Sequence, residues 1–305
     1  MSASPPGVRD RLVEPRIVPL GGIRGLSVHR TLPLRGLPTV GPWCFVDQFG
    51  PTLSRMQVMP HPHTGLQTVT WPLAGEIRHR DSRGSDVVLK PGELNLMTSG
   101  DGVSHSEVSV GTKPTVMHGI QLWVALPNTR RLGPSNFEHH ANLPRVEGEG
   151  WHATVMLGEL EGAKSPARTY SPIVGAELRL GPGRSRIPLD AGFEHAILAV
   201  DGMAIVDEHV DVGHREMYYL ALGREEVTID VRTDTIVLLI GGEPFTEQLL
   251  MWWNFIGRTH EDIVEARNDW EAESERFGFV DGHDGVRIPA PPMPNVRLTP
   301  RRRTL

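Results

Sequence analysis

Glycine and proline divide this chain into short apolar runs. The 305 residues include 33 Gly and 26 Pro, and runs rich in Val, Ile, Leu and Thr lie between them at intervals of about ten residues. Residues 81–84 and 90–92 are two such breaks, and the Pro-Gly pair in the second suits a type II turn. No helical periodicity is visible before residue 240. The pattern predicts an all-β chain built from sandwiches or barrels.

Two β-rich stretches are separated by a segment with little periodicity. We expect a first β unit over 1–130, a linker over 131–150 and a second β unit over 151–242. Residues 73–76 and 200–203 lie in similar strand–turn–strand contexts, with an offset of 202 − 75 = 127 between their glycines. An internal duplication is consistent with that spacing.

The sequence changes character after residue 242. We expect a crossover segment and a helix over 243–280, packing on the two β units. Thr259, followed by acids, is typical of a helix N-cap, and predicts a helix over about 260–276 that ends before Gly278. Its apolar face would carry Ile263, Ala266 and Trp270. The Pro- and Arg-rich stretch 281–305 is expected to be a flexible tail.

Composition excludes several classes of protein. The net charge of −6 argues against a general nucleic-acid binder, which would carry a basic surplus. A single cysteine, Cys44, excludes a disulfide framework and a cysteine-based zinc site. No membrane-length apolar run or secretory signal is visible, so we expect a cytoplasmic protein. With 3 Lys among 31 basic residues, the Arg bias is typical of a GC-rich bacterial genome.

Two His-containing pairs form the strongest chemical signal. His61 and His63 are two residues apart, as are His105 and Glu107, and residues at this spacing on a strand face the same side. On adjacent strands they would bring together three imidazole nitrogens and a carboxylate, which suit Fe, Mn, Co, Ni or Zn and leave positions open for a substrate. The alternative is that such pairs are surface or core histidines without a ligand.

The stretch HPHTGLQTVTWPLAGEIRHRDSRGSDVVLKPGELNLMTSGDGVSHSE, residues 61–107, resembles the core of the pirin family, a group of bicupins. Matching flanks are GPWCFVDQF at 41–49, HGIQLW at 118–123 and GEPF at 242–245. The resemblance extends over most of residues 15–270. It implies two cupin-type β-barrel (jelly-roll) domains packed together, with a short C-terminal helix.

The resemblance also implies one mononuclear metal in the N-terminal barrel. Iron, as Fe(II), is the metal we expect, with Zn, Mn, Ni and Co as alternatives. Position by position, the ligands would be His61, His63, His105 and Glu107. Some pirin-like proteins are associated with quercetin 2,3-dioxygenase activity, so a small aromatic substrate and O₂ would be the partners. Glu107 is then the candidate base, if it can leave the metal.

Two positions depart from the family pattern. Thr64 stands where many relatives carry Arg, and Gln67 stands where Glu is common. We expect Gln67 to hydrogen-bond to a ligand or to bound water. Other side chains expected beside the site are Phe45, Asp47, Gln121 and Trp123.

The second β unit lacks the same pairs. The offset of 127 places Pro188 and Asp190 where the first unit has its His-x-His. We therefore expect a metal-free second unit, in which His195 is structural; His79 and His118 in the first unit are expected to be core residues or neighbours of the ligands.

Three classes of function remain open at this point. The first is an iron-dependent dioxygenase acting on quercetin-like flavonols. The second is a non-enzymatic metal- or redox-dependent regulator that binds a transcription factor or a metabolic enzyme. The third is a zinc or manganese hydrolase or isomerase, which the ligand set also permits. Direct nucleic-acid binding and membrane association are not expected.

Overall fold

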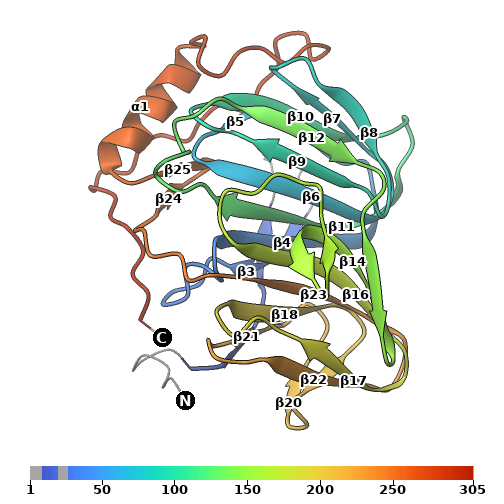
Figure 1. Cartoon of the computed structure of the whole chain (residues 1–305). Coiled ribbons are helices and arrows are strands. Elements are labelled where there is room, and N and C mark those ends of the chain that lie inside the picture. Colours follow the sequence, from blue (N-terminus) through green and yellow to red (C-terminus); the bar gives the residue numbers. More distant parts are fainter. Residues whose placement is uncertain (1–8, 20–26, 305) are drawn as a thin grey trace.

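The computed structural model describes residues 9–19 and 27–304 and shows two β-sandwiches, one above the other in Figure 1. Within these residues, each half has a large sheet facing a four-stranded one. In spatial order the large sheet of the first half is β12 (Asn136–His140), β9 (Leu94–Thr98), β6 (Leu66–Ala74), β11 (Thr115–Ala125), β4 (Trp43–Ser54), β3 (Ser27–Leu32) and β2 (Arg16–Pro19). Its small sheet is β5 (Gln57–His63), β10 (Val103–Ser109), β7 (Ile77–Asp81) and β8 (Asp86–Leu89).

The second half repeats this plan. Its large sheet is β1 (Arg11–Val13), β21 (Met217–Leu220), β18 (Glu194–Asp201), β23 (Thr235–Gly242), β16 (Ile173–Leu180), β14 (Trp151–Leu160) and β13 (Arg145–Gly148), with β15 (Ala163–Lys164) paired to β14. Its small sheet is β17 (Gly183–Pro188), β22 (Glu226–Val231), β19 (Ala204–Val206) and β20 (Val210–Val212).

Strand order shows the internal duplication that the sequence offset indicates. Strand by strand, β9-β6-β11-β4-β3-β2 corresponds to β21-β18-β23-β16-β14-β13, and β5-β10-β7-β8 corresponds to β17-β22-β19-β20. Two cupin domains are therefore present, as expected. Among the described strands, however, neither half closes into a hydrogen-bonded ring, so each is an open jelly-roll sandwich rather than a closed barrel.

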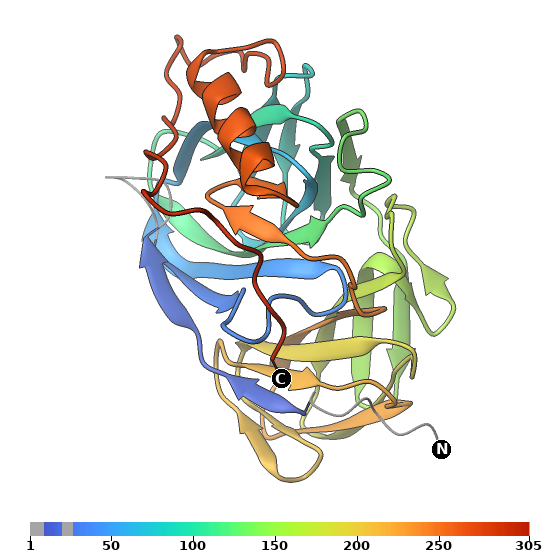
Figure 2. The same ribbon diagram turned by 90° about the vertical axis from the view of Figure 1, so that its left-hand side faces the viewer.

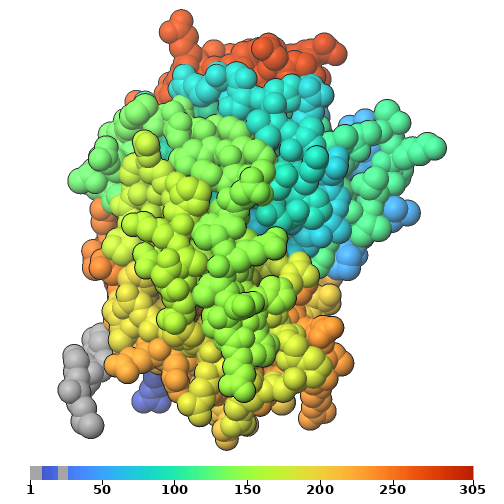
Figure 3. All heavy atoms as spheres, turned by 45° about the vertical axis from the view of Figure 1, so that its right-hand side comes forward, coloured from blue at the N-terminus to red at the C-terminus, as the bar shows by residue number. Residues whose placement is uncertain are grey.

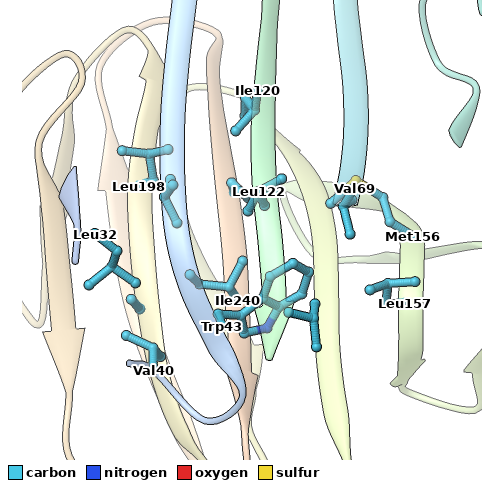
Figure 4. Close-up of a cluster of buried hydrophobic side chains, with 14 of the residues drawn as sticks. Leu32, Val40, Trp43, Val69, Ile120, Leu122, Met156, Leu157, Leu198 and Ile240 are labelled. Carbon is cyan, nitrogen blue, oxygen red and sulfur yellow. The ribbon is translucent and has the colours of Figure 1, made fainter. Parts of the chain in front are cut away.

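The two large sheets pack against each other, and their shared face is the main hydrophobic core (Figure 4). Alternation along each strand creates this face, since successive side chains point to opposite sides. On β6, Val69 and Trp71 point toward the second half, whereas Thr70 points into the first. Trp43 ties the halves together by donating its indole N–H to the carbonyls of Val174 and Gly241, each at 3.1 Å. Other members of this face are Ile120, Leu122, Met156, Leu157, Leu198 and Ile240.

Two expected boundaries need correction. Strand β1, placed in the first unit by sequence, pairs with β21 of the second half. The expected linker 131–150 contains β12 and β13, which form edges of the two large sheets. Both are mostly polar or exposed, because an edge strand is held by backbone pairing on one side and needs little apolar periodicity.

The C-terminal segment folds over the first half. A hairpin of β24 (Leu250–Trp252) and β25 (Phe255–Gly257) leads into helix α1 (His260–Glu271). Thr259 forms the expected capping box with Asp262, and Ile263, Ala266 and Trp270 are buried as predicted. The helix ends at 271 rather than near 276, since Glu273 adopts a left-handed φ of 53°. No helix in the described ranges is long and apolar enough to cross a membrane.

The expected flexible tail instead packs along the molecule up to residue 304. Figure 2 shows it running from the helix to the junction of the two halves, and Figure 3 shows the C-terminal segment in red over the top of the first half. Ile288 N–H donates to the Pro60 carbonyl at 2.8 Å, and Arg303 pairs with the buried carboxylate of Glu194. Composition does not reveal these distant partners, so the sequence alone could not predict the packed course of this segment.

Candidate metal centre

Strands β5 and β10 bring three histidines together inside the first sandwich. They pair antiparallel, with His105 opposite His61, and the side chains point between the sheets. His61, His63 and His105 are 7%, 1% and 1% exposed, and one donor nitrogen from each lies within 4.8 Å of the others. The convergence predicted from the two-residue spacing is therefore present.

Backbone carbonyls orient two of these rings. His61 Nδ1 lies 2.9 Å from the Met59 carbonyl oxygen, and His63 Nδ1 lies 3.2 Å from that of Asn254. A carbonyl can only accept, so each Nδ1 carries the proton and donates it. That tautomer leaves the Nε2 lone pair free, which is the usual way in which a neighbouring group prepares a histidine for a metal.

The Nε2 atoms of His63 and His105 lie close enough together to share one metal ion. These atoms are 3.1 Å apart. Two ligand nitrogens at about 2.1 Å from one ion, at roughly a right angle, would have this separation. The chain's own donors thus fit a bound metal ion.

Burial keeps these imidazoles neutral. It lowers the pKa of His61 to about 4. Burial, reinforced by the charge of His61, also holds the pKa values of His63 and His105 well below their ordinary range. Metal ligation requires neutral imidazole, so the environment favours the ligating form at neutral pH.

Glu107 lies in the same cavity but on the side of His79. A donor oxygen of Glu107 groups with nitrogens of His79 and His105 within 4.8 Å, rather than with all three central histidines. Thr70 Oγ1 donates to Glu107 Oε1 at 2.7 Å. Burial raises the pKa of the Glu107 carboxyl, whereas His79 and the Thr70 hydrogen bond act in the opposite direction.

His79 is closer to the centre than its sequence context suggests. Its Nδ1 lies 3.3 Å from His105 Nδ1, and its Nε2 lies 3.3 Å from the Asp81 carboxylate. The ring stacks on Phe137, with centroids 4.3 Å apart. His79 thus connects the buried carboxylate of Asp81 to His105, one of the three clustered histidines.

The cavity around the histidines is small and partly aromatic. Its volume is about 60 Å³, and its walls include Phe45, Gln121 and Trp123, as expected. Phe45 and Trp123 stack with centroids 4.0 Å apart, and Trp123 meets His63 edge-on at 5.2 Å. Gln121 Oε1 lies 3.1 Å from Thr70 Oγ1, the hydroxyl that donates to Glu107.

Two of the expected neighbours lie elsewhere. Gln67 lies on the same side of β6 as Val69 and faces the second half. Its Nε2 donates to Thr98 Oγ1 on the neighbouring strand β9 and to the Arg168 carbonyl of the second half. The predicted contact of Gln67 with the ligands is therefore wrong. Asp47 forms a two-point ion pair with Arg30 at 2.7 Å and does not line the cavity. Arg30 in turn lies over Phe45, so Asp47 supports the aromatic wall.

Sequence analysis missed the contribution of the C-terminal segment. Asn254 lies at the tip of the β24–β25 hairpin and lines the cavity, 191 positions beyond its partner His63. Ile256 N–H donates to the Thr64 carbonyl at 3.0 Å, which holds the hairpin against the end of β5. A backbone carbonyl carries no residue-type signal, so no motif could have shown this contact.

Among the described residues of the second half, no group of potential metal ligands lies at β17, the strand that corresponds to β5. Both groups of potential metal ligands found in the described ranges lie in the first half. Pro188 ends β17, the counterpart of β5, and Asp190 and His195 lie beside a separate cavity. His118 is also outside the metal centre and contacts Gln48 at 3.2 Å.

Comparison with known proteins agrees with this architecture. The Pirin family model matches residues 25–124, and the model of the Pirin C-terminal cupin domain matches residues 176–278. A Pseudomonas aeruginosa protein named as a candidate quercetin 2,3-dioxygenase is 40% identical over 92% of this chain and 90% of its own length. A pirin-like protein of Caulobacter vibrioides is 37% identical over 86% of this chain and 94% of its own.

A crystal structure of a quercetin 2,3-dioxygenase from Acinetobacter baumannii superposes with a TM-score of 0.90. It is 40% identical in sequence, and the match covers 95% of this chain and 97% of that one. The overall fold is therefore shared with that enzyme over nearly the whole of both chains.

Proposed function

The chain belongs to the pirin family, and from that premise we propose that it is an iron-dependent dioxygenase acting on quercetin-like flavonols. The observation that carries the proposal is the buried group of His61, His63 and His105 with Glu107 in the same cavity. These four residues would hold the metal, as the family resemblance implies. Bound there, iron would supply Lewis-acid and redox chemistry for a reaction with O₂.

Iron is proposed on the family resemblance together with the donor set. Three imidazole nitrogens and a carboxylate suit iron, and they equally suit Mn, Co, Ni and Zn. The metal analysis described in the Discussion distinguishes these ions.

Glu107 is the proposed acceptor of the flavonol hydroxyl proton, a role that requires its carboxylate to leave the metal first. The single hydroxyl proton of Thr70 is directed to the nearer acceptor, Glu107 Oε1 at 2.7 Å, and this bond orients the carboxylate in the cavity. The phenyl and indole rings of Phe45 and Trp123 supply an apolar wall for a flat aromatic substrate.

Access requires a movement of the C-terminal hairpin. Pockets for small organic ligands usually measure about 300–1,000 Å³, and the cavity of about 60 Å³ is far below that range. Asn254 at the hairpin tip forms part of its wall. We therefore propose that β24 and β25 withdraw from β5 when the flavonol enters.

The test is O₂-dependent loss of quercetin absorbance with iron-loaded protein. We expect turnover in the wild type and none in His105→Ala, because one of the three central nitrogens is lost. The exposed His209 is outside the cavity, so His209→Ala should retain full activity. Protein that contains iron but leaves a panel of flavonols unchanged would refute the dioxygenase proposal.

The small closed cavity favours a second candidate, a metal- or redox-dependent regulator that binds a transcription factor or a metabolic enzyme. In that case the hairpin would stay closed and the metal would act without an organic substrate. A partner retained from a lysate by the iron-loaded protein in one oxidation state only, together with absent turnover, would support this role. Equal retention in both states, or by His105→Ala, would exclude it.

A further inference from the structure

The second sandwich contains a cavity of about 480 Å³ that the proposed reaction does not use. Pro188, Leu189 and Asp190 form part of its wall at the end of β17, the strand that corresponds to the metal-bearing β5. Its volume lies within the range of about 300–1,000 Å³ that is usual for small-ligand pockets. The second half has therefore kept a ligand-sized space at a related place, without the metal ligands.

A buried histidine lines this space and lacks a hydrogen-bond partner. His195 and Ile197 are two residues apart on β18, so their side chains lie on the same side of the strand. The Ile197 side chain points into the second sandwich. The residue is 1% exposed, and its Nδ1 has no partner in the part of the chain that the structure describes. Gly241 on the neighbouring strand leaves room for the ring, since a Cβ there would lie 2.5 Å from His195 Cδ2.

The His195 imidazole is neutral, and its Nδ1 atom is buried without a hydrogen bond from the described residues. Burial lowers its pKa to about 4, despite the opposing charge of Asp190. An unsatisfied buried polar atom costs about 1–3 kcal/mol, and native proteins contain few of them. In the tautomer that carries its proton on Nε2, Nδ1 is an acceptor, and a ligand with a hydrogen-bond donor would remove that cost.

The charged residues around the cavity indicate which kind of ligand could supply this hydrogen-bond donor. Glu159, Glu161 and Asp190 line it, and no Lys or Arg of the described ranges does. Within those ranges neither Glu159 nor Glu161 has an ion-pair partner. All three acids are exposed, so solvent screens their field, but its sign still favours a cation over an anion. Leu160, Phe193 and Leu239 add apolar wall beside these charges.

We propose that this cavity binds a small primary amine with an apolar body. The ammonium group donates a hydrogen bond to the His195 imidazole and lies in the field of Asp190 and Glu161. The apolar body packs against Leu160 and Phe193. Nothing in the arrangement suits a carboxylate or a phosphate ligand.

Titration calorimetry with phenethylamine on the metal-loaded protein tests the proposal. We expect saturable binding of one amine, little or no binding of the neutral analogue 2-phenylethanol, and the same isotherm after chelation of the metal. His195→Phe keeps the ring volume and removes both nitrogens, so the affinity should fall about tenfold or more. Asp190→Asn with Glu161→Gln should weaken binding about two- to tenfold and reduce its dependence on salt.

Glu149→Gln is the matched control, because Glu149 is an exposed acid of the same half outside the cavity. It should bind like the wild type. Unchanged affinity in His195→Phe would overturn the proposal, as would equal binding of the alcohol or loss of binding on chelation. Tight binding of Zn²⁺ that depends on His195 and excludes the amine would replace the amine by a metal ion.

Discussion

At the residue scale, the metal centre depends on contacts that fix the orientation of each donor. His61 and His63, two of the proposed ligands, donate Nδ1–H to main-chain carbonyls, and the Glu107 carboxylate accepts from Thr70. Partners of this kind commonly change metal affinity by about 10–100-fold when they are removed. Their effects can be separated from those of the ligands themselves.

Thr70→Val should weaken metal binding about tenfold, because Glu107 loses the donor that orients it. Competition with a chelator of known affinity measures the change. Thr68→Val is the matched control, since Thr68 is buried on the same face of β6 but does not line the cavity. If both variants lose affinity equally, Thr70 has no specific role in positioning Glu107.

Gln67→Glu should destabilise the fold without improving metal binding. The Gln67 Nε2 donates to Thr98 and to the Arg168 carbonyl at the face between the halves, and a carboxylate could not make these bonds. We expect a loss of about 1–3 kcal/mol in the free energy of unfolding, measured by urea denaturation of the metal-free protein. Increased metal affinity in this variant would instead place position 67 at the metal.

The sequence predicted the grouping of the three histidines better than their surroundings. The spacing of His61, His63 and His105 was sufficient because strand parity is a local property. Alternation along β6 also explains why Gln67 points away from the histidines. That conclusion requires knowing which face of β6 packs against the second half, and the sequence does not show this. Asn254 could not be predicted, since it contributes a main-chain oxygen from a segment far along the chain.

At the scale of single elements, the β24–β25 hairpin is the part that decides access to the metal. Thr64 and Phe255 form a parallel bridge between the end of β5 and this hairpin. Neighbouring strands lie about 4.7–4.9 Å apart, a distance that a disulfide can span. The bridge therefore offers a way to lock the hairpin closed.

The double variant Thr64→Cys, Phe255→Cys should turn over quercetin when reduced and lose turnover when the disulfide forms. The metal content should be the same in both states. The reduced form of the same protein is the control, since it carries any cost of removing the Phe255 ring. Equal turnover in both states would show that the substrate does not pass the hairpin.

At the scale of the whole molecule, the tail connects the two halves. Glu194 is 1% exposed and accepts from Gly41 N–H, Tyr219 and Arg303. Arg303 also donates to the carbonyl and the hydroxyl of Thr39. A Pro- and Arg-rich stretch was expected to be flexible, and this buried carboxylate is one of several contacts along its course.

Arg303→Ala should lower the free energy of unfolding by about 3–5 kcal/mol, because it leaves the Glu194 charge buried without its cation. Chemical denaturation at neutral pH measures this loss. Arg302→Ala is the matched control, since Arg302 is exposed and forms no ion pair in the described part of the chain. Equal stability of the two variants would mean that the tail does not hold the halves together.

The metal-free protein should lose stability as the pH falls from 6.5 toward 4. In the unfolded chain histidine takes up a proton near pH 6.5, whereas burial lowers the pKa of folded His61 and His195 to about 4. The unfolded state therefore binds more protons in this window, and stability that is complete above pH 6.5 declines on acidification. By pH 4, each of these two histidines lowers the free energy of unfolding by about 3 kcal/mol relative to its value at neutral pH.

Urea midpoints at pH 7 and pH 4.5, with a chelator present, measure this decline. His195→Phe should reduce the pH dependence, since one of the buried imidazoles is gone. A midpoint that does not change with pH would show that these histidines are solvated and not held in the neutral form.

The most direct test of the metal centre is the metal content of anaerobically purified protein, compared between the wild type and His63→Ala. The account predicts about one iron per wild-type chain and almost none in the variant, with the fold of both intact by circular dichroism. Wild-type protein without metal, or a variant that retains as much as the wild type, would contradict the assignment of the three histidines as ligands.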